Sequence, residues 1–370
     1  MSHQVRVAIE RTSIAVQRNR QVLMAGSRAA RGTAECAGSM WLRVNTIEHL
    51  ESIDLDRARG ALIGAAAGDA LGAPYEFTRP GSDAEIIPKG GGAFGWEPSE
   101  WTDDTAMTVA VARGLLAANA LADHGLNAVA QEFRVWLSSG PKDVGRQTKV
   151  VILHGGSTAQ SMTEFARTKV DRGAGNGSLM RTAPVALRYL TDAVHCVSAA
   201  MQISDLTHPD PHAAQACAMW SYAIRHAVLL GDFNGPHQYL DEFATPSERG
   251  FWGELLRRAE HAGPTDFRNN GWVVDAVATA WWAITNAPGV HEQHLAGVLE
   301  RAVRAGGDTD TTAAIAGALV GARWGAEAVP AQWKVDLHGY PGIDANGLAE
   351  LADSLVEKSQ VCERVSRSGT

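Results

Sequence analysis

The stretch RAGGDTDTTAAIAGALVGA, residues 304–322, leads from a glycine pair through a polar segment into a run of small apolar residues. Two aspartates, Asp308 and Asp310, stand two residues apart just before that run, with threonines around them. A helix that is apolar on all sides is typical of a protein core. The stretch therefore predicts a buried helix whose first turn carries more carboxylate than a helix cap needs.

A second stretch, EWTDDTAMTVAVARGLL at residues 100–116, has the same organisation. Thr102, Asp103 and Asp104 stand before a predicted helix of about four turns. Capping explains either stretch taken alone, because threonine and acidic side chains satisfy free N–H groups and the helix dipole. Both helices are nearly all small and apolar, however, and buried carboxylates are unfavourable unless they are paired or bind a cation.

If the two helix ends meet, their carboxylates repel one another and a bound metal is the natural remedy. Neither motif contains cysteine or histidine, so the candidate ligands are all hard oxygen atoms. That ligand set favours Mg²⁺ or Mn²⁺ over zinc. Two ions about 3.5–4 Å apart are the arrangement expected for shared carboxylates.

The remainder of the chain predicts an all-α fold, because its apolar residues recur at three- and four-residue spacing. Runs typical of strands are few, residues 5–9 and 149–152 being the best, and they form no regular set. Examples of the predicted helical stretches are Leu55–Leu71, Thr105–Ala122, Leu126–Leu137, Ala183–Tyr189, Ala213–Leu230, Phe251–His261, Val273–Thr285, His294–Ala305 and Thr311–Ala328.

The composition excludes several classes of protein. The 370 residues are 45% apolar and 20% charged, which is typical of a globular protein with a sizeable core. A net charge of −8 gives no general attraction for nucleic acid. The four cysteines are scattered without a C-x-x-C pair, which indicates a reducing, cytoplasmic location. No apolar run reaches membrane-spanning length without a charge, so we expect no membrane segment.

Five motifs carry a resemblance to a known family. They are GALIGAAAGDALGAPYEF (60–77), WTDDTAMTVAVA (101–112), GAGNGSLMRTAPVAL (173–187), SDLTHPDP (204–211) and GGDTDTTAAIAGALVGA (306–322). In this order they resemble the ADP-ribosylglycohydrolases, over about residues 54 to 330. The resemblance implies an all-α fold with a binuclear Mg²⁺ or Mn²⁺ site. It also implies removal of ADP-ribose from modified protein side chains, arginine in the best-known branch.

The resemblance further implies roles for individual residues. The metal ligands would be Thr102, Asp103, Asp104, Asp308, Asp310 and Thr311, with Asp310 bridging both ions. Glu76 would face the metals and the scissile ribose, although an isolated glutamate at this place reads as a surface residue. Asp143 would hold the leaving guanidinium or act on the ribose. Asp69 is expected to cap or brace a neighbouring helix.

Substrate binding is assigned to Asn176, Gly177, Ser178 and His208. The glycine-rich loop offers backbone N–H groups suited to a diphosphate, although a plain tight turn has the same composition. His208 would line the nucleotide pocket, and its alternative is a core or helix-start histidine.

Residues 1–53 are expected to be a separate extension, before a catalytic domain at 54–357 and a polar tail at 358–370. Residues 1–43 hold seven arginines and two glutamates. A disordered or misassigned start, a transit-like leader and a partner-binding arm all fit, and scattered apolar residues favour the arm. Some immunity proteins against ADP-ribosyltransferase toxins resemble this arrangement. The function is then hydrolase, toxin-blocking protein or both, with ADP-ribosyl-serine or another N-glycoside as alternative substrates.

Overall fold

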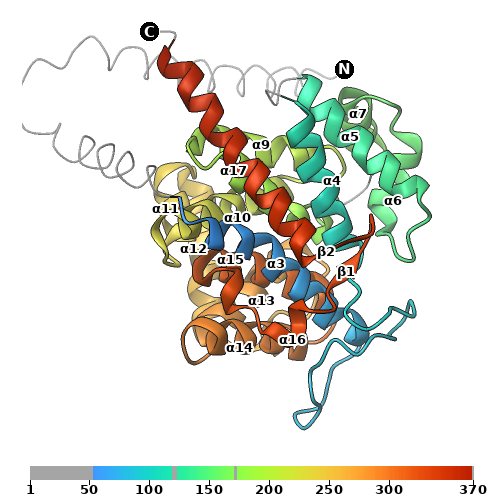
Figure 1. The fold of residues 1–370 in the computed structure, drawn as a ribbon, viewed down its shortest axis with the longest axis vertical. Coiled ribbons are helices and arrows are strands. Elements are labelled where there is room, and N and C mark those ends of the chain that lie inside the picture. The colour runs from blue at the N-terminus through green and yellow to red at the C-terminus, as the bar shows by residue number, and fades with distance from the viewer. Residues whose placement is uncertain (1–52, 119–122, 171–172, 369–370) are drawn as a thin grey trace, which may run out of the picture. The chain divides into compact units, whose positions relative to one another are not determined.

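The computed structural model describes residues 53–118, 123–170 and 173–368, and Figure 1 shows this part of the chain as layers of helices. The predicted all-α class is confirmed. Strands in the described part are limited to β1 (His338–Gly339) and β2 (Ile343–Asp344), which pair antiparallel with His338 opposite Asp344.

The α-helices are α3 (Leu55–Gly72), α4 (Asp103–Ala117), α5 (Asp123–Ser138), α6 (Arg146–His154), α7 (Ala159–Lys169), α8 (Ala183–Arg188), α9 (Ala193–Asp205), α10 (Pro211–Leu230), α11 (Gly235–Glu242), α12 (Pro246–His261), α13 (Val273–Asn286), α14 (His291–Arg304), α15 (Thr309–Trp324), α16 (Ala331–Lys334) and α17 (Ala345–Ser368). Short 3₁₀ helices are η1 (Ala73–Tyr75), η2 (Asn176–Arg181), η3 (Pro264–Asp266) and η4 (Ala326–Ala328).

The centre of the fold is the pair α3 and α15, whose backbones touch. Glycines recur every fourth residue of α3 and therefore share one face of the helix. An ideal Cβ on Gly64 would fall 2.5 Å from the carbonyl oxygen of Gly317, and one on Gly321 would fall 2.0 Å from that of Gly60. These contacts run antiparallel, so the C-terminal end of α3 meets the N-terminal end of α15.

Other helices enclose this pair. In Figure 1, α17 crosses beside α3, while α13 and α14 lie near α15. From α10, the indole N–H of Trp220 donates to the carbonyl of Ile315 in α15 at 2.9 Å. Helices α5, α6 and α7 form a group beside α4. The α3–α15 pair is thus covered by large side chains, which hold it in place.

Several elements differ from the sequence predictions. Residues 149–152 lie in α6, because Val151 and Ile152 are buried on one helix face and tertiary packing overrides their strand propensity. Helices α7, α9, α11, α16 and α17 lie outside the stretches named as examples of predicted helices. Helix α17 also includes residues 358–368, which the sequence assigned to a polar tail. Residues 5–9 and nearly all of the predicted extension lie outside the described residues. No helix in the described part is long and apolar enough to cross a bilayer.

Candidate active site: a buried acidic centre

The contact of α3 with α15 brings acidic residues from three elements together. Glu76 follows η1 at the end of α3, Asp103 and Asp104 open α4, and Asp308 and Asp310 open α15. Glu76, Asp308 and Asp310 each place a carboxylate oxygen within 4.8 Å of the others. The hydroxyl of Thr311 donates to Asp104 Oδ2 at 3.3 Å, so the ends of α4 and α15 meet.

Capping does not explain the acidic residues of α4. Asp69 of α3 is fully buried and accepts from the backbone N–H groups of Thr102 at 3.0 Å and Thr105 at 2.9 Å. The hydroxyl of Thr105 donates to it at 2.6 Å. Thr102 is the N-cap residue and accepts from Asp104 N–H. The bracing role predicted for Asp69 is confirmed, whereas a hydrogen bond from the backbone of Gly145 acts on Asp103.

The start of α15 is held by an asparagine that the sequence motifs did not indicate. Asn270 accepts from the backbone N–H of Asp308 at 3.0 Å and donates to the carbonyl of Gly306 at 2.8 Å. Asp308 makes no side-chain cap. Its Oδ2 instead accepts from Asn176 Nδ2 at 2.7 Å. Asn270 and Asn176 thus fix the loop that presents Asp308.

Backbone pairing with the same loop positions Glu76. Phe77 N–H donates to the carbonyl of Gly307 at 2.7 Å, and Gly307 N–H donates to the carbonyl of Thr78 at 3.0 Å. Gly307 has φ +76°, and a Cβ there would fall 2.5 Å from Asn270 Oδ1. Only glycine fits both conditions, and the two backbones can therefore approach closely here.

Burial and mutual repulsion raise the pKa values of these acids. Burial, with Asp308 and Asp143 nearby, raises the pKa of Glu76 to about 9. Burial, with Asp143 and Asp69, raises that of Asp103 to about 8. The pKa values of Asp104 and Asp310 are also raised well above the ordinary range, first by burial.

Three buried carboxylate oxygens have no hydrogen-bond partner within the described part of the chain, namely Glu76 Oε2, Asp104 Oδ1 and Asp310 Oδ1. None of the ion pairs found there involves these residues. Unpaired buried carboxylates in a shared cluster are unfavourable without a cation. Because all the donors are oxygen atoms, the centre fits a hard divalent ion.

The remaining predicted residues lie around this centre in different ways. Asp143 is half-buried between α5 and α6, and burial raises its pKa, with Asp308 adding to the effect. Gly177 packs on His208, since a Cβ there would fall 3.2 Å from His208 Nε2. The hydroxyl of Ser178 is instead engaged with Ser204 and Cys217 in the core. A ligand contact by Ser178 would therefore use its backbone N–H.

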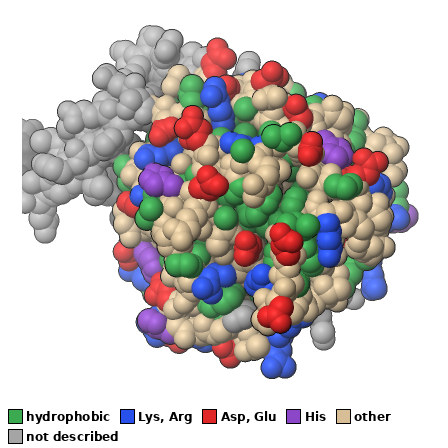
Figure 2. All heavy atoms as spheres, turned by 60° about the horizontal axis from the view of Figure 1, so that its bottom comes forward, with side chains coloured by type: hydrophobic (Ala, Val, Ile, Leu, Met, Phe, Trp, Pro, Cys, Tyr) green, Lys and Arg blue, Asp and Glu red, His purple; other side chains and the backbone are tan. Residues whose placement is uncertain are grey.

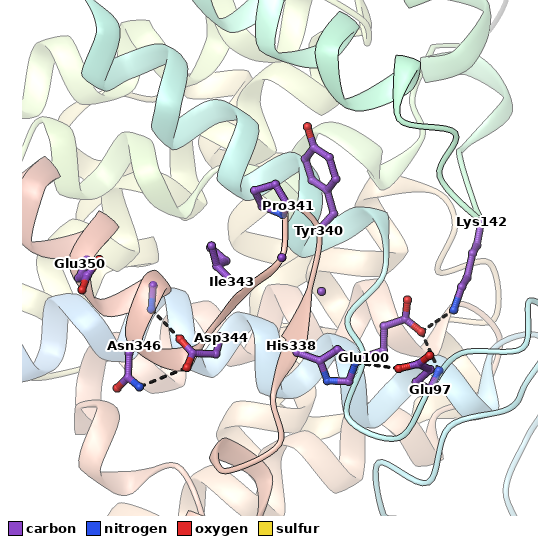
Figure 3. A pocket seen from close by; sticks show the side chains of 13 residues that line it. Glu97, Glu100, Lys142, His338, Tyr340, Pro341, Ile343, Asp344, Asn346 and Glu350 are labelled. Atoms are coloured by element: carbon purple, nitrogen blue, oxygen red, sulfur yellow. Dashed lines mark hydrogen bonds and ion pairs between the residues drawn. The ribbon is translucent and has the colours of Figure 1, made fainter.

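A separate open groove of about 940 Å³ does not include these acids. It lies between the segment 97–100 and the β1–β2 hairpin (Figure 3). Lys142 pairs with Glu100 at 2.6 Å, and His338 contacts Glu97 at 3.3 Å. Figure 2 shows a face of the molecule on which acidic side chains lie among hydrophobic ones, with basic side chains around them.

The fold and the site define an all-helical protein with a buried carboxylate centre of the kind that holds divalent cations. Residues 50–364 match the family model described as ADP-ribosylglycohydrolase. The chain is 31% identical to the ADP-ribosyl-[dinitrogen reductase] glycohydrolase of Rhodospirillum rubrum, over 76% of this chain and 91% of that protein. The chain belongs to the ADP-ribosylglycohydrolase family.

Two further comparisons agree. The ADP-ribosylarginine hydrolase Tri1 of Serratia proteamaculans is 27% identical, over 85% of this chain and 83% of that protein. A solved structure described as an ADP-ribosylglycohydrolase-related protein complex superposes with a TM-score of 0.64 and 27% identity, covering 82% of this chain and 98% of that chain.

Proposed function

We propose that this chain hydrolyses the N-glycosidic bond between ADP-ribose and an arginine side chain of a modified protein, with two Mg²⁺ or Mn²⁺ ions. The observation that carries the proposal is the cluster of buried, unpartnered carboxylate oxygens where α3, α4 and α15 meet. The relatives named as acting on ADP-ribosyl groups support hydrolysis of the bond that joins ADP-ribose to a protein. The relative named as an ADP-ribosylarginine hydrolase supports arginine as the modified side chain.

The ligands assigned to the ions are Thr102, Asp103, Asp104, Asp308, Asp310 and Thr311. Bound divalent cations supply positive charge that polarises ribose oxygens and acidifies water. Asp310 places a carboxylate oxygen within 4.8 Å of those of Glu76 and Asp308, and the next residue, Thr311, donates to Asp104. This position supports its assignment as the ligand shared by both ions.

Glu76 is assigned as the general base. Its Oε2 has no hydrogen-bond partner among the described residues and lies in the acidic cluster. With cations bound beside it, Glu76 would be ionised, and its carboxylate could accept a proton from attacking water while the ribose C1 develops oxocarbenium character. Asp143, beside Glu76, would pair with the leaving guanidinium, whose planar fork matches a carboxylate.

The loop at 173–178 is assigned to the ADP part of the substrate. Asn176 connects this loop to Asp308, and His208 lies beneath Gly177. Backbone N–H groups in such a loop suit a diphosphate. The ribose would thus sit at the acids and the nucleotide along the loop.

The decisive test compares ADP-ribosyl-arginine with ADP-ribosyl-serine peptides, each with Mg²⁺ and with excess chelator. We expect hydrolysis of the arginine conjugate only with metal, and none by Asp310→Asn. Faster hydrolysis of the serine conjugate would mean that serine, and not arginine, is the modified side chain. Full activity in chelator would overturn the metal assignment.

We also propose that residues 1–53 bind an ADP-ribosyltransferase toxin. Seven arginines among residues 1–43 suit a cleft lined by carboxylates or aromatic rings. Deleting residues 1–50 should keep peptide hydrolysis within about threefold and greatly weaken toxin binding. Unchanged toxin binding by the truncated protein would end the toxin-binding proposal.

The location that we propose for the protein is the cytoplasm. The free, buried thiols of Cys196 and Cys217 suit that location.

A further inference from the structure

A buried arginine lies behind the proposed nucleotide loop without a carboxylate partner among the described residues. Arg181 ends η2 and is fully buried. Its guanidinium lies 4.4 Å from the ring centre of Phe133, Nη1 donates to Met107 Sδ at 3.3 Å, and Nη2 donates to Thr207 Oγ1 at 2.6 Å. Burial lowers its pKa to about 10, so it stays protonated at neutral pH.

Thr207 connects this cation to His208, the next residue. The Thr207 hydroxyl lies 2.8 Å from His208 Nδ1. An arginine can only donate, so the hydroxyl oxygen accepts from Arg181 and its single hydrogen remains to be placed. If His208 Nδ1 carried a proton, the Thr207 hydroxyl would lie between two donors, Arg181 Nη2 and His208 Nδ1. The hydrogen of this buried hydroxyl would then have no acceptor. The hydroxyl therefore donates to Nδ1.

The imidazole proton then has one position left. Burial and the charge of Arg181 lower the pKa of His208 to about 3, so the ring is neutral at neutral pH. A neutral ring with an accepting Nδ1 carries its proton on Nε2. The buried guanidinium of Arg181 thus sets the tautomer of His208 through the hydroxyl group of Thr207.

The Nε2–H group faces the glycine loop and has no hydrogen-bond partner within the described residues. Ideal Cβ atoms on Gly175 and Gly177 would fall 3.4 and 3.2 Å from Nε2. The side chain is only 3% exposed. An N–H group that makes no hydrogen bond to the described residues is available to an acceptor atom on a ligand at this loop. Arg181 makes no ion pair with a carboxylate of the described residues, although the charge of Asp103 acts on it, so its positive charge favours an anionic acceptor at this loop.

We propose that Arg181 and Thr207 are positioning residues that hold His208 as the Nε2–H tautomer, which donates a hydrogen bond to an anionic diphosphate oxygen of ADP-ribose at the 175–177 loop. The identity of this ligand rests on the proposed function. The hydrogen-bond chain from Arg181 through Thr207 to His208, which we call the relay, rests on the contacts of these residues in the free protein.

The first experiment reads the tautomer directly. Nitrogen-15 NMR of the full-length protein with labelled histidine should show a bare Nδ1 and a protonated Nε2 for His208 from pH 5 to 8. The ring is identified by its absence from the spectrum of His208→Gln. Adding ADP-ribose with Mg²⁺ should shift the Nε2–H signal while Nδ1 stays bare. An Nδ1–H tautomer, or a ring that becomes doubly protonated by pH 5, would overturn the relay.

The second experiment uses a matched pair at Thr207. Thr207→Val keeps the shape but removes the hydroxyl, whereas Thr207→Ser keeps the hydroxyl. We expect calorimetry to give ADP-ribose binding about tenfold weaker for the valine variant and within about twofold of the native protein for the serine variant. The loss should be in KM more than in kcat. Equal affinities for both variants would overturn the positioning role.

Failure of the relay and failure of the proposed function can be told apart. If the valine variant does not fold, the NMR spectrum of the native protein alone decides the tautomer. If the native protein binds no ADP-ribose, the proposed function and the diphosphate contact both fall. Only the NMR spectrum of the free protein can overturn the tautomer assigned to His208.

Discussion

Gly72, the last residue of α3, lies in backbone contact with Asp310 in the first turn of α15. An ideal Cβ on Gly72 would fall 2.4 Å from the Cα of Asp310. The hydroxyl of Thr309 also donates to the carbonyl of Gly72 at 2.9 Å. Because Glu76 follows directly after η1, the register between the two helices sets how near Glu76 comes to Asp310.

The first prediction tests this helix contact. Gly321→Ala would place a Cβ 2.0 Å from the carbonyl oxygen of Gly60, so the two helices must separate. We expect the free energy of unfolding in urea to fall by about 3 kcal/mol. The control is Gly250→Ala, at an exposed position of α12 with open space around it, which should gain about 0.5–1 kcal/mol. A tolerated Gly321→Ala would contradict the close contact.

The second prediction separates a metal ligand from a structural acid. Asp310→Asn removes an unpaired buried carboxylate, so the metal-free protein should gain about 1–3 kcal/mol of stability and lose metal affinity. Asp69→Asn puts an amide where three donors point, so it should lose stability by a similar amount. Calorimetric metal titration and urea unfolding check both variants, and the same behaviour in the two would sink the distinction.

The third prediction concerns metal removal. A cation that binds only the folded protein raises its stability by mass action. At about 100 times Kd, Mg²⁺ or Mn²⁺ should add about 2.7 kcal/mol, seen as a lower melting temperature in excess chelator and recovery on adding metal. Asp310→Asn serves as the control and should show little shift. An identical melting temperature with and without chelator in the native protein would refute metal binding.

The fourth prediction concerns the buried neutral histidine. The pKa of His208 is about 3 in the folded protein and about 6.5 when unfolded. Between these values the unfolded chain binds more protons, so this contribution is present above pH 6.5 and is lost as the pH falls. From pH 6.5 to 5, the native protein should lose about 1.5 kcal/mol more stability than His208→Gln. Urea unfolding in chelator at both pH values measures this, and parallel losses would disprove it.

Much of the fold could be predicted because the long helices are apolar at regular spacing. The helix α15 is an example, with its acidic first turn followed by small residues. The helix α6 could not be predicted from the same rule, because Val150, Val151 and Ile152 prefer strands in isolation. The burial of Val151 and Ile152 beside α5 and α7 favours a helix there, and such packing is not visible in local sequence.

The acids at the starts of α4 and α15 were identifiable because they stand in repeated motifs, whereas Glu76 was indicated only by the family resemblance. Asn270 was not, since it is one polar residue in the loop FRNNGW and gains its role only beside Gly306. Ser178 illustrates the opposite case. Its motif predicts binding, yet the hydroxyl points to Ser204 and Cys217. Side-chain direction in a glycine-rich loop depends on tertiary contacts.

The contact of α3 with α15 also fixes when the protein can first act during its synthesis. Gly72 and Thr309 are separated by 237 residues in the chain. At ordinary elongation rates, a ribosome needs roughly ten seconds or more to cover that distance. During this time the glycine face of α3 has no helix to pack against, because α15, with Asp308 and Asp310, has not yet been synthesised. A chain that stops before α15 therefore has neither a complete acidic centre nor a covered central helix, and it is a substrate for chaperones rather than an enzyme.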